Sequence, residues 1–284
     1  MNALLKCNIF ARHISYTREM VNNSGSRYRN LFRHIQNWPA YFLRKLKKGF
    51  RPVTFMTKGY AKKFLVPSKA LYLVFKEIFV SDFYDIDELV ASLPANPVII
   101  DIGANAGYFN IMLFSKIKEG LVYAYEPIPS NYELFNKNIS LNPGLQNHIH
   151  LYNKAVTGTA SETVELFMEE ASENSVIASV YADFDLQNKY RLEVPAITLQ
   201  QIIQENNLQH IDLIKIDCEG SEYPIIYETP DDLWDKIDML TIEVHNLDKE
   251  KRNTGYLQKF LEQKNYRVET AFAHSNCYTL TAKR

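Results

Sequence analysis

The chain has 284 residues, long enough for one large α/β domain with an appendage, and its 46% hydrophobic and 23% charged residues exclude a globally disordered protein. Its cysteines, Cys7, Cys218 and Cys277, include no CxxC pair, which excludes a disulfide framework and favours a reducing compartment. No run approaches the roughly 18 apolar residues of a membrane span, and charges interrupt the first twenty residues. We therefore expect a soluble, cytoplasmic protein without a transmembrane segment.

Charge is distributed unevenly along the chain. Residues 1–63 carry fourteen Lys and Arg against one acid, Glu19, whereas residues 64–284 carry 18 basic and 32 acidic residues. Such asymmetry is typical of a basic arm that meets an anionic partner. We predict an aromatic-rich arm over 1–63, with one or two short helices broken near Pro39, and a catalytic domain over 64–284 with its core at 97–284.

From Val98 onward, apolar strand-like runs alternate with helical periodicity. This alternation predicts an α/β fold: a Rossmann-like, doubly wound, mostly parallel seven-stranded sheet with a C-terminal β-hairpin and a helical N-terminal extension. A β insertion is expected near 157–195. The expected strands are 98–102, 121–125, 148–152, 211–216, 237–244 and the final pair 266–273 and 277–282, and the expected helices are 107–118, 130–141, 199–205 and 252–264.

The first chemical signal is a turn at the end of the first strand. Gly103 and Gly107 permit positive φ or close approach to a ligand, and ligands of open α/β sheets bind at the carboxyl ends of strands. A dinucleotide fingerprint fails, because Asn105 and Tyr108 stand where it needs glycine. Asp101, the acid that ends the strand, fits a cationic ligand instead, namely the methionyl amino group of S-adenosylmethionine.

A second acid follows the next predicted strand. Glu126 comes about twenty residues after the glycine turn, where a carboxylate accepts hydrogen bonds from both ribose hydroxyls of a nucleoside. It follows directly on five largely apolar residues, which disfavours a solvated surface glutamate. The two acids together favour a cofactor site.

A third block, IKIDCEGSE, has another apolar strand that ends in an acid. Asp217 ends the strand, and Glu219 and Glu222 follow closely. These carboxylates are expected to hold the methyl acceptor, to orient the methionyl end of the cofactor, or to bind a divalent cation. Lys215, inside the strand, is expected to pair with a neighbouring acid, and Cys218 is expected to pack rather than to act as a nucleophile.

The fourth block is IEVH, on a later strand. Glu243 and His245 are two residues apart, so both point to one face of the strand. A histidine whose pKa lies near neutrality is a natural general base for a hydroxyl proton. A purely structural histidine is an equally weighted alternative.

Together, VIIDIGANAGYF, YAYEPIPSNYELFNKNISLN, LIKIDCEGSEYPII and IEVH resemble the FkbM family of S-adenosylmethionine-dependent methyltransferases, from about residue 70 to residue 270. The resemblance implies a class I methyltransferase fold and methylation of hydroxyl oxygens, often on sugars or polyketide-type products. One segment departs from the family pattern: TLQQI, from Thr198, stands where TLDDL is usual. The resemblance implies a cofactor-binding set of Asp101, Gly103, Asn105, Gly107 and Glu126, with Asn153 and Ala155 near the adenine, and an acceptor side of Asp217, Glu219, Glu243 and His245.

The arm lies outside this resemblance and leaves several functions open. The leading hypothesis is O-methylation of a glycan or a small hydroxylated molecule. RNA is a second acceptor, since basic residues interleaved with aromatic ones suit phosphate contacts and base stacking. Alternatively, the arm tethers the enzyme to a partner or a membrane surface, or packs on the acidic body as a helical lid, which is slightly favoured. Metal dependence and oligomeric state have no readable signal.

Overall fold

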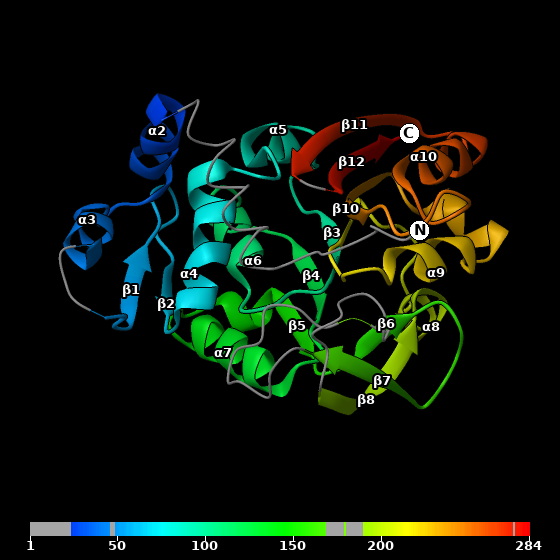
Figure 1. Cartoon of the computed structure of the whole chain (residues 1–284), viewed down its shortest axis with the longest axis horizontal. Helices are drawn as coiled ribbons and strands as arrows, with labels where there is room; N and C mark the ends of the chain where they lie inside the picture. The colour runs from blue at the N-terminus through cyan, green and yellow to red at the C-terminus, as the bar shows by residue number, and fades with distance from the viewer. Residues whose placement is uncertain (1–23, 46–48, 169–178, 180–189, 275) are drawn as a thin grey trace, which may run out of the picture. The chain divides into compact units, whose positions relative to one another are not determined.

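The computed structural model describes residues 24–45, 49–168, 179, 190–274 and 276–284 (Figure 1). Within them the chain divides into two compact units, residues 24–153 (the N-terminal unit) and residues 154–284 (the C-terminal unit). The largest sheet has seven strands in the order β11-β12-β10-β9-β3-β4-β5. The predicted α/β fold with a mostly parallel seven-stranded sheet is thereby confirmed.

The N-terminal unit contains three parallel strands, β3 (Val98–Ile102), β4 (Leu121–Tyr125) and β5 (Ile149–Tyr152). Most of β3 and β4 is buried, as expected of parallel strands that read as continuous apolar runs. Helix α6 (Tyr108–Leu113), which follows β3, is buried along its whole length. Helix α7 (Pro129–Ser140) follows β4, and a short 3₁₀ turn, Leu145–Asn147, leads into β5.

The described residues before Lys69 form two helices, where one or two were expected around Pro39, and a hairpin that the sequence did not predict. The helices are α2 (Ser24–His34) and α3 (Pro39–Lys45), and the hairpin pairs β1 (Val53–Met56) with β2 (Lys63–Val66). The hairpin lies beside α4 (Lys69–Lys76) in Figure 1. A π-helical turn, Glu77–Ser81, and α5 (Ile86–Ala91) complete this part.

Aromatic stacking anchors the hairpin in the core. The ring of Phe55 stacks on Phe75 with centroids 4.3 Å apart, and the ring of Phe64 stacks on Phe79 at 4.6 Å. All four rings are fully buried. Stacked aromatic pairs of this kind stabilise by about 0.5–1.5 kcal/mol beyond the burial of their area. The basic segment therefore ends in a hairpin built into the core of the N-terminal unit.

Two asparagines of the α7 region tie the hairpin to the rest of the unit. The backbone N–H of Leu65 donates to Oδ1 of Asn138 at 2.8 Å, and Nδ2 of Asn138 donates to the carbonyl of Ala106 at 2.9 Å. Asn142 likewise accepts from the N–H of Lys63 and donates to its carbonyl, both at 2.7 Å. The amide of Asn138 thus links the hairpin directly to the turn after β3.

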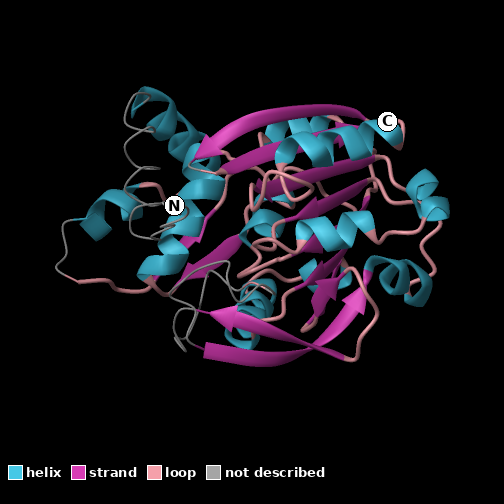
Figure 2. Ribbon diagram, turned by 45° about the vertical axis from the view of Figure 1, so that its right-hand side comes forward, coloured by secondary structure: helices cyan, strands magenta, loops and turns pink. Residues whose placement is uncertain are grey.

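The C-terminal unit is built on β9 (Leu213–Ile216), β10 (Met239–His245), β11 (Arg267–His274) and β12 (Cys277–Lys283). Strand β10 runs parallel to β9 and antiparallel to β12, and β11 and β12 form the C-terminal hairpin, as predicted (Figure 2). Helix α9 (Glu222–Tyr227), a 3₁₀ turn (Asp231–Lys236) and α10 (Thr254–Gln263) connect the strands.

A smaller sheet precedes these strands, where the β insertion is expected. It joins β6 (Ala155–Thr157), β8 (Tyr190–Thr198) and β7 (Thr163–Met168) in that order. Its core contains Ala155, Leu166 and Val194. Part of the expected insertion, residues 169–189, lies outside the described residues, except for Ser179, which bridges to Phe167.

The segment TLQQI, which departs from the usual TLDDL, caps the start of a helix. Helix α8 (Leu199–Glu205) begins with a capping box in which the Gln201 N–H donates to Oγ1 of Thr198 at 3.2 Å and the Thr198 N–H donates to Oε1 of Gln201 at 2.9 Å. Gln201 therefore stabilises the start of α8.

Among the helices that the structure describes, none has the length and apolarity needed to cross a membrane.

Candidate functional site

In the N-terminal unit, the turn between β3 and α6 is folded against the end of β4. Gly103, Asn105 and Gly107 all have left-handed backbones, with φ of 77°, 49° and 77°. The N–H groups of Gly103 and Ala104 both donate to the carbonyl of Tyr125 at 3.0 Å, and Oδ1 of Asn105 accepts the N–H of Ala106 at 2.7 Å. Asparagine is among the few non-glycine residues that adopt this conformation readily. These left-handed residues therefore let the chain turn tightly from β3 into α6.

Glu126 holds this turn from the next strand. Its Oε2 accepts the N–H of Asn105 at 2.7 Å and its Oε1 accepts the N–H of Ile128 at 2.9 Å, and the residue is only 4% exposed. An ionised carboxylate has about four acceptor positions, so two backbone bonds orient it without exhausting its capacity. The predicted ribose-binding acid is thus fixed in place beside the glycine turn.

Asp101 lies near the end of β3 and Asn153 directly follows β5, the two strands that flank β4. Asp101, in β3, is fully buried and accepts a hydrogen bond from Nδ2 of Asn110 at 2.5 Å. Nδ2 of Asn153 donates to the carbonyls of Glu126 and Pro127 at 2.8 and 2.9 Å. Asn110 was missed by the sequence analysis, although an amide within the apolar run FNIML of α6 was a signal. Ala155, by contrast, lies in the core of the small sheet of the C-terminal unit.

In the C-terminal unit, three glutamates surround His245 at the carboxyl end of β10. Oxygen atoms of Glu219 and Glu243 lie 3.4 Å from its Nε2, and Oε1 of Glu222 lies 3.4 Å from its Nδ1. The imidazole is 2% exposed, whereas the side chain of Glu219 is 16% exposed. The structure thus brings together Glu219, Glu243 and His245, which the sequence analysis placed on the acceptor side.

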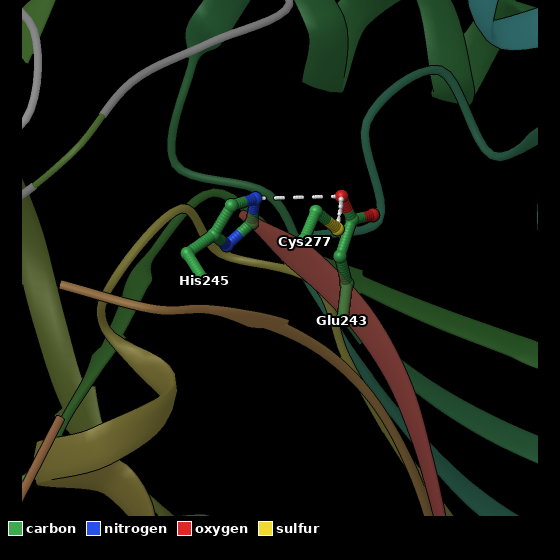
Figure 3. A group of neighbouring side chains, drawn as sticks. All are labelled: Glu243, His245 and Cys277. Atoms are coloured by element: carbon green, nitrogen blue, oxygen red, sulfur yellow. Dashed lines mark hydrogen bonds and ion pairs between the residues drawn. The ribbon is translucent and has the colours of Figure 1, made fainter. Parts of the chain in front are cut away.

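Glu222 and Cys277 complete this cluster. Glu222 is fully buried, and its two oxygens accept the N–H groups of Gly220 at 2.7 Å and His245 at 2.9 Å. The Cys277 thiol donates to Oε1 of Glu243 at 3.0 Å (Figure 3). Cys277 was missed, because only the pairing of β12 with β10, in which Cys277 stands opposite His245, brings it to the site.

The surroundings of His245 favour the protonated form of its ring. Burial lowers the pKa of His245, but the charge of Glu219, together with contacts to Cys277, Glu222 and Glu243, raises the pKa well above its ordinary value. The protonated ring has no nitrogen ready to accept a proton. A general-base role for His245 stays a prediction, and it requires that the ring first pass its proton on.

Asp217 has a separate partner. Its Oδ2 lies 3.3 Å from Nζ of Lys215, whose side chain is buried inside β9, so the predicted ion pair is confirmed. Burial raises the pKa of the Cys218 thiol well above its ordinary value, in line with a packing role.

Glu219 has a left-handed backbone with φ of 47°, and its carbonyl accepts the Ser179 hydroxyl at 2.7 Å. This geometry fixes the loop between β9 and α9.

Residues 101–268 match the model of a protein family described as the methyltransferase FkbM domain. The chain belongs to the FkbM methyltransferase family. The match spans every predicted site residue from Asp101 to His245 and ends before Cys277. The predictions of an FkbM family member, of a methyltransferase and of S-adenosylmethionine as its methyl donor are confirmed.

Individual relatives of this FkbM methyltransferase carry the same activity in their names. Methyltransferase sdnD of Sordaria araneosa is 25% identical over 194 residues, which cover 60% of this chain and 73% of the relative. Methyltransferase 1 of Beauveria bassiana is 27% identical over 233 residues, 74% of this chain and 89% of the relative. Among solved structures, precorrin-6y C5,15-methyltransferase of Geobacter metallireducens is 15% identical with a TM-score of 0.42, over 70% of this chain and 87% of that one.

Proposed function

We propose that this FkbM methyltransferase transfers the methyl group of S-adenosylmethionine to a hydroxyl oxygen of a sugar, a glycan or a small natural product. The observation that carries the proposal is the clamped carboxylate of Glu126, held by the N–H groups of Asn105 and Ile128 beside a turn with three left-handed residues. A fixed acid at the end of the second parallel strand suits the two ribose hydroxyls of the cofactor.

The remaining cofactor contacts are assigned from position. Gly103, Asn105 and Gly107 present backbone to the methionyl part of the cofactor. The buried Asp101 supplies negative charge behind the turn, which favours the methionyl ammonium group. Asn153, which follows β5 in the chain, is assigned to the adenine side.

Methyl transfer needs no covalent enzyme intermediate. The acceptor oxygen attacks the methyl carbon, the carbon–sulfur bond breaks, its electron pair stays on sulfur and S-adenosylhomocysteine leaves. The enzyme contributes proximity and orientation, and a side chain removes the hydroxyl proton. We assign the proton to Glu219, the most exposed acid of the cluster around His245, and assign Asp217, Glu243 and His245 to the acceptor side.

RNA is the second candidate acceptor. Helices α2 and α3 and the loop between them expose the rings of Tyr28, Phe32 and Trp38, and Arg29 beside Tyr28 is also exposed. Such rings serve as stacking platforms for bases, and arginines contact phosphates. Incubation with isotopically labelled S-adenosylmethionine separates the candidates: label in hydroxylated sugars supports the proposal, and label in RNA that Trp38→Ala abolishes supports the alternative. The cytoplasmic location stays a prediction.

Calorimetric titration with S-adenosylhomocysteine tests the cofactor site. We expect Glu126→Gln to weaken binding by about 10–100-fold, because replacing one oxygen with an amide loses charge and at least one hydrogen bond. Glu133→Gln, an exposed glutamate on α7, is the matched control and should bind as the wild type does. Failure of the wild type to bind, or equal binding by Glu126→Gln, contradicts the proposed site.

A further inference from the structure

Three metal-binding side chains of different chemistry meet where β10 ends and β12 begins. They are Glu243, His245 and Cys277, and their ligand atoms all lie within 4.8 Å of one another (Figure 3). All three are buried. A carboxylate, an imidazole and a thiol are the three ligand types from which proteins build zinc sites. We propose that this cluster binds one divalent cation of the zinc class.

The separations between the ligand atoms suit a tetrahedral ion. Zinc bonds of about 2.0–2.3 Å place tetrahedral ligand atoms roughly 3.3–3.8 Å apart. In the structure, Nε2 of His245 lies 3.4 Å from Oε1 of Glu243, and Sγ of Cys277 lies 3.0 Å from the same oxygen. The shorter distance belongs to the thiol hydrogen bond, which coordination replaces. These two separations therefore need to change by about half an ångström or less to suit a tetrahedral ion.

The backbone holds the ligands in this arrangement. Cys277 and His245 are direct partners in the antiparallel register of β10 and β12, and Glu243 lies two residues before His245 on the same face. Ligands on paired strands are placed more precisely than ligands on loops. This juxtaposition is a property of the sheet and does not depend on a bound ion.

The surroundings of His245 add an independent argument. A histidine that ligates a metal through one nitrogen nearly always directs the other to a carboxylate or carbonyl, which orients the ring. Nδ1 of His245 lies 3.4 Å from Oε1 of Glu222, which leaves Nε2 to face Glu243 and Cys277. Glu222 is itself fixed by the N–H groups of Gly220 and His245. The cluster thus has the carboxylate–histidine–metal pattern.

The charge of the cluster also favours a bound cation. Glu219, Glu222 and Glu243 surround a single imidazole, so carboxyl groups outnumber the one basic group in a buried place. A divalent cation offsets this excess, since buried charges persist where they are paired or bound to metal. Coordination needs a thiolate and a neutral imidazole, so the proton of the Cys277 thiol and the proton on Nε2 of His245 both pass to solvent when the metal binds.

The fourth coordination position lies beside Glu219, whose Oε2 is 3.4 Å from Nε2 of His245 and whose side chain is the most exposed of the cluster. A hydroxyl bound there would lose its proton more readily, because the cation lowers its pKa. This step rests on the proposed function, whereas the metal site itself does not.

The test uses the full chain, stripped with a chelator and then titrated with Zn²⁺ alone by calorimetry and with Co²⁺ alone by absorption. We expect one equivalent to bind and Co²⁺ to show a thiolate charge-transfer band. Cys277→Ser should abolish the band and weaken Zn²⁺ binding at least 100-fold, and Glu243→Gln should weaken binding about 10–100-fold. Circular dichroism establishes that both variants fold.

Two control variants make the result specific. Cys218→Ser removes a thiol outside the cluster and should leave both signals unchanged. His210→Ala disrupts a second group of possible ligands, His210, Asp212 and Asp238, two of which are exposed, and should leave one equivalent bound. Absence of stoichiometric binding, binding unchanged in Cys277→Ser, or binding lost only in His210→Ala overturns the inference. Titration with S-adenosylhomocysteine on the same samples reports on the proposed function separately.

Discussion

Gly107→Ala is expected to destabilise the N-terminal unit by about 2–5 kcal/mol and to weaken binding of S-adenosylhomocysteine. The backbone of Gly107 has φ of 77°, a left-handed conformation that costs an alanine about 1–2 kcal/mol. A Cβ at this position also overlaps the ring of Phe135, which is fully buried on α7, so the ring has to shift within a packed core. Overpacking of this kind costs about 1–3 kcal/mol more. Urea denaturation measures the loss of stability, and calorimetry measures the loss of affinity.

A matched glycine separates the two causes. Gly144 also has a left-handed backbone, with φ of 98°, but a Cβ there meets nothing within 4 Å. Gly144→Ala should therefore show the backbone cost alone, about 1–2 kcal/mol, and leave cofactor binding unchanged. In the double variant Gly107→Ala/Phe135→Leu, the loss of stability should be smaller than the sum of the losses in the two single variants, because the smaller side chain leaves room for the Cβ. If Gly107→Ala costs no more than Gly144→Ala, the proposed steric conflict is absent.

The turn after β3 and the acid after β4 were largely predictable because their signals are local in sequence. The turn from Gly103 to Gly107 follows an apolar strand directly, and Glu126 follows the next one, so position along the chain was enough to place both. The clamp between them was not predictable. It depends on a bond from the Asn105 N–H to a carboxylate 21 residues away, which only the parallel register of β3 and β4 creates.

The hairpin β1–β2 escaped prediction for a tertiary reason. Each strand has only four residues, too few for a clear period-two pattern, and the hairpin lies at the end of a segment whose basic charge suggested a helical arm that meets an anionic partner. What fixes the hairpin is tertiary: Phe55 and Phe64 stack on Phe75 and Phe79. Packing partners of this kind leave no trace in local periodicity.

The proximity of Glu243 and His245 was predicted from the sequence, but the pKa of the histidine was not. Alternation along a strand placed Glu243 and His245 on one face, and both are buried together. The sequence suggested a histidine with a pKa near neutrality, whereas Glu219 and Glu222, from the loop after β9 and the start of α9, help to raise its pKa well above that. A pKa depends on distances between segments, which spacing in one strand does not contain.

Glu222→Ala is expected to have the largest effect in the C-terminal unit, a loss of about 3–5 kcal/mol. The side chain is fully buried and accepts two backbone hydrogen bonds, from Gly220 in the loop after β9 and from His245 at the end of β10. Each bond to a charged acceptor contributes about 1.5–3 kcal/mol, and its removal leaves a buried N–H without an acceptor. Amide hydrogen exchange should therefore accelerate at Gly220 and His245, by about 100-fold or more.

Glutamine distinguishes the loss of hydrogen bonds from the loss of volume at this position. Glu222→Gln nearly preserves the shape of the side chain but has a single acceptor oxygen, so one of the two N–H groups must face an amide donor. We expect a loss of about 1.5–3 kcal/mol and faster exchange at one of the two amides rather than at both. Glu228→Ala, at an exposed position directly after α9, is the control and should change neither. If the amides of Gly220 and His245 exchange as slowly in Glu222→Ala as in the wild type, the carboxylate does not hold the loop after β9 to the end of β10.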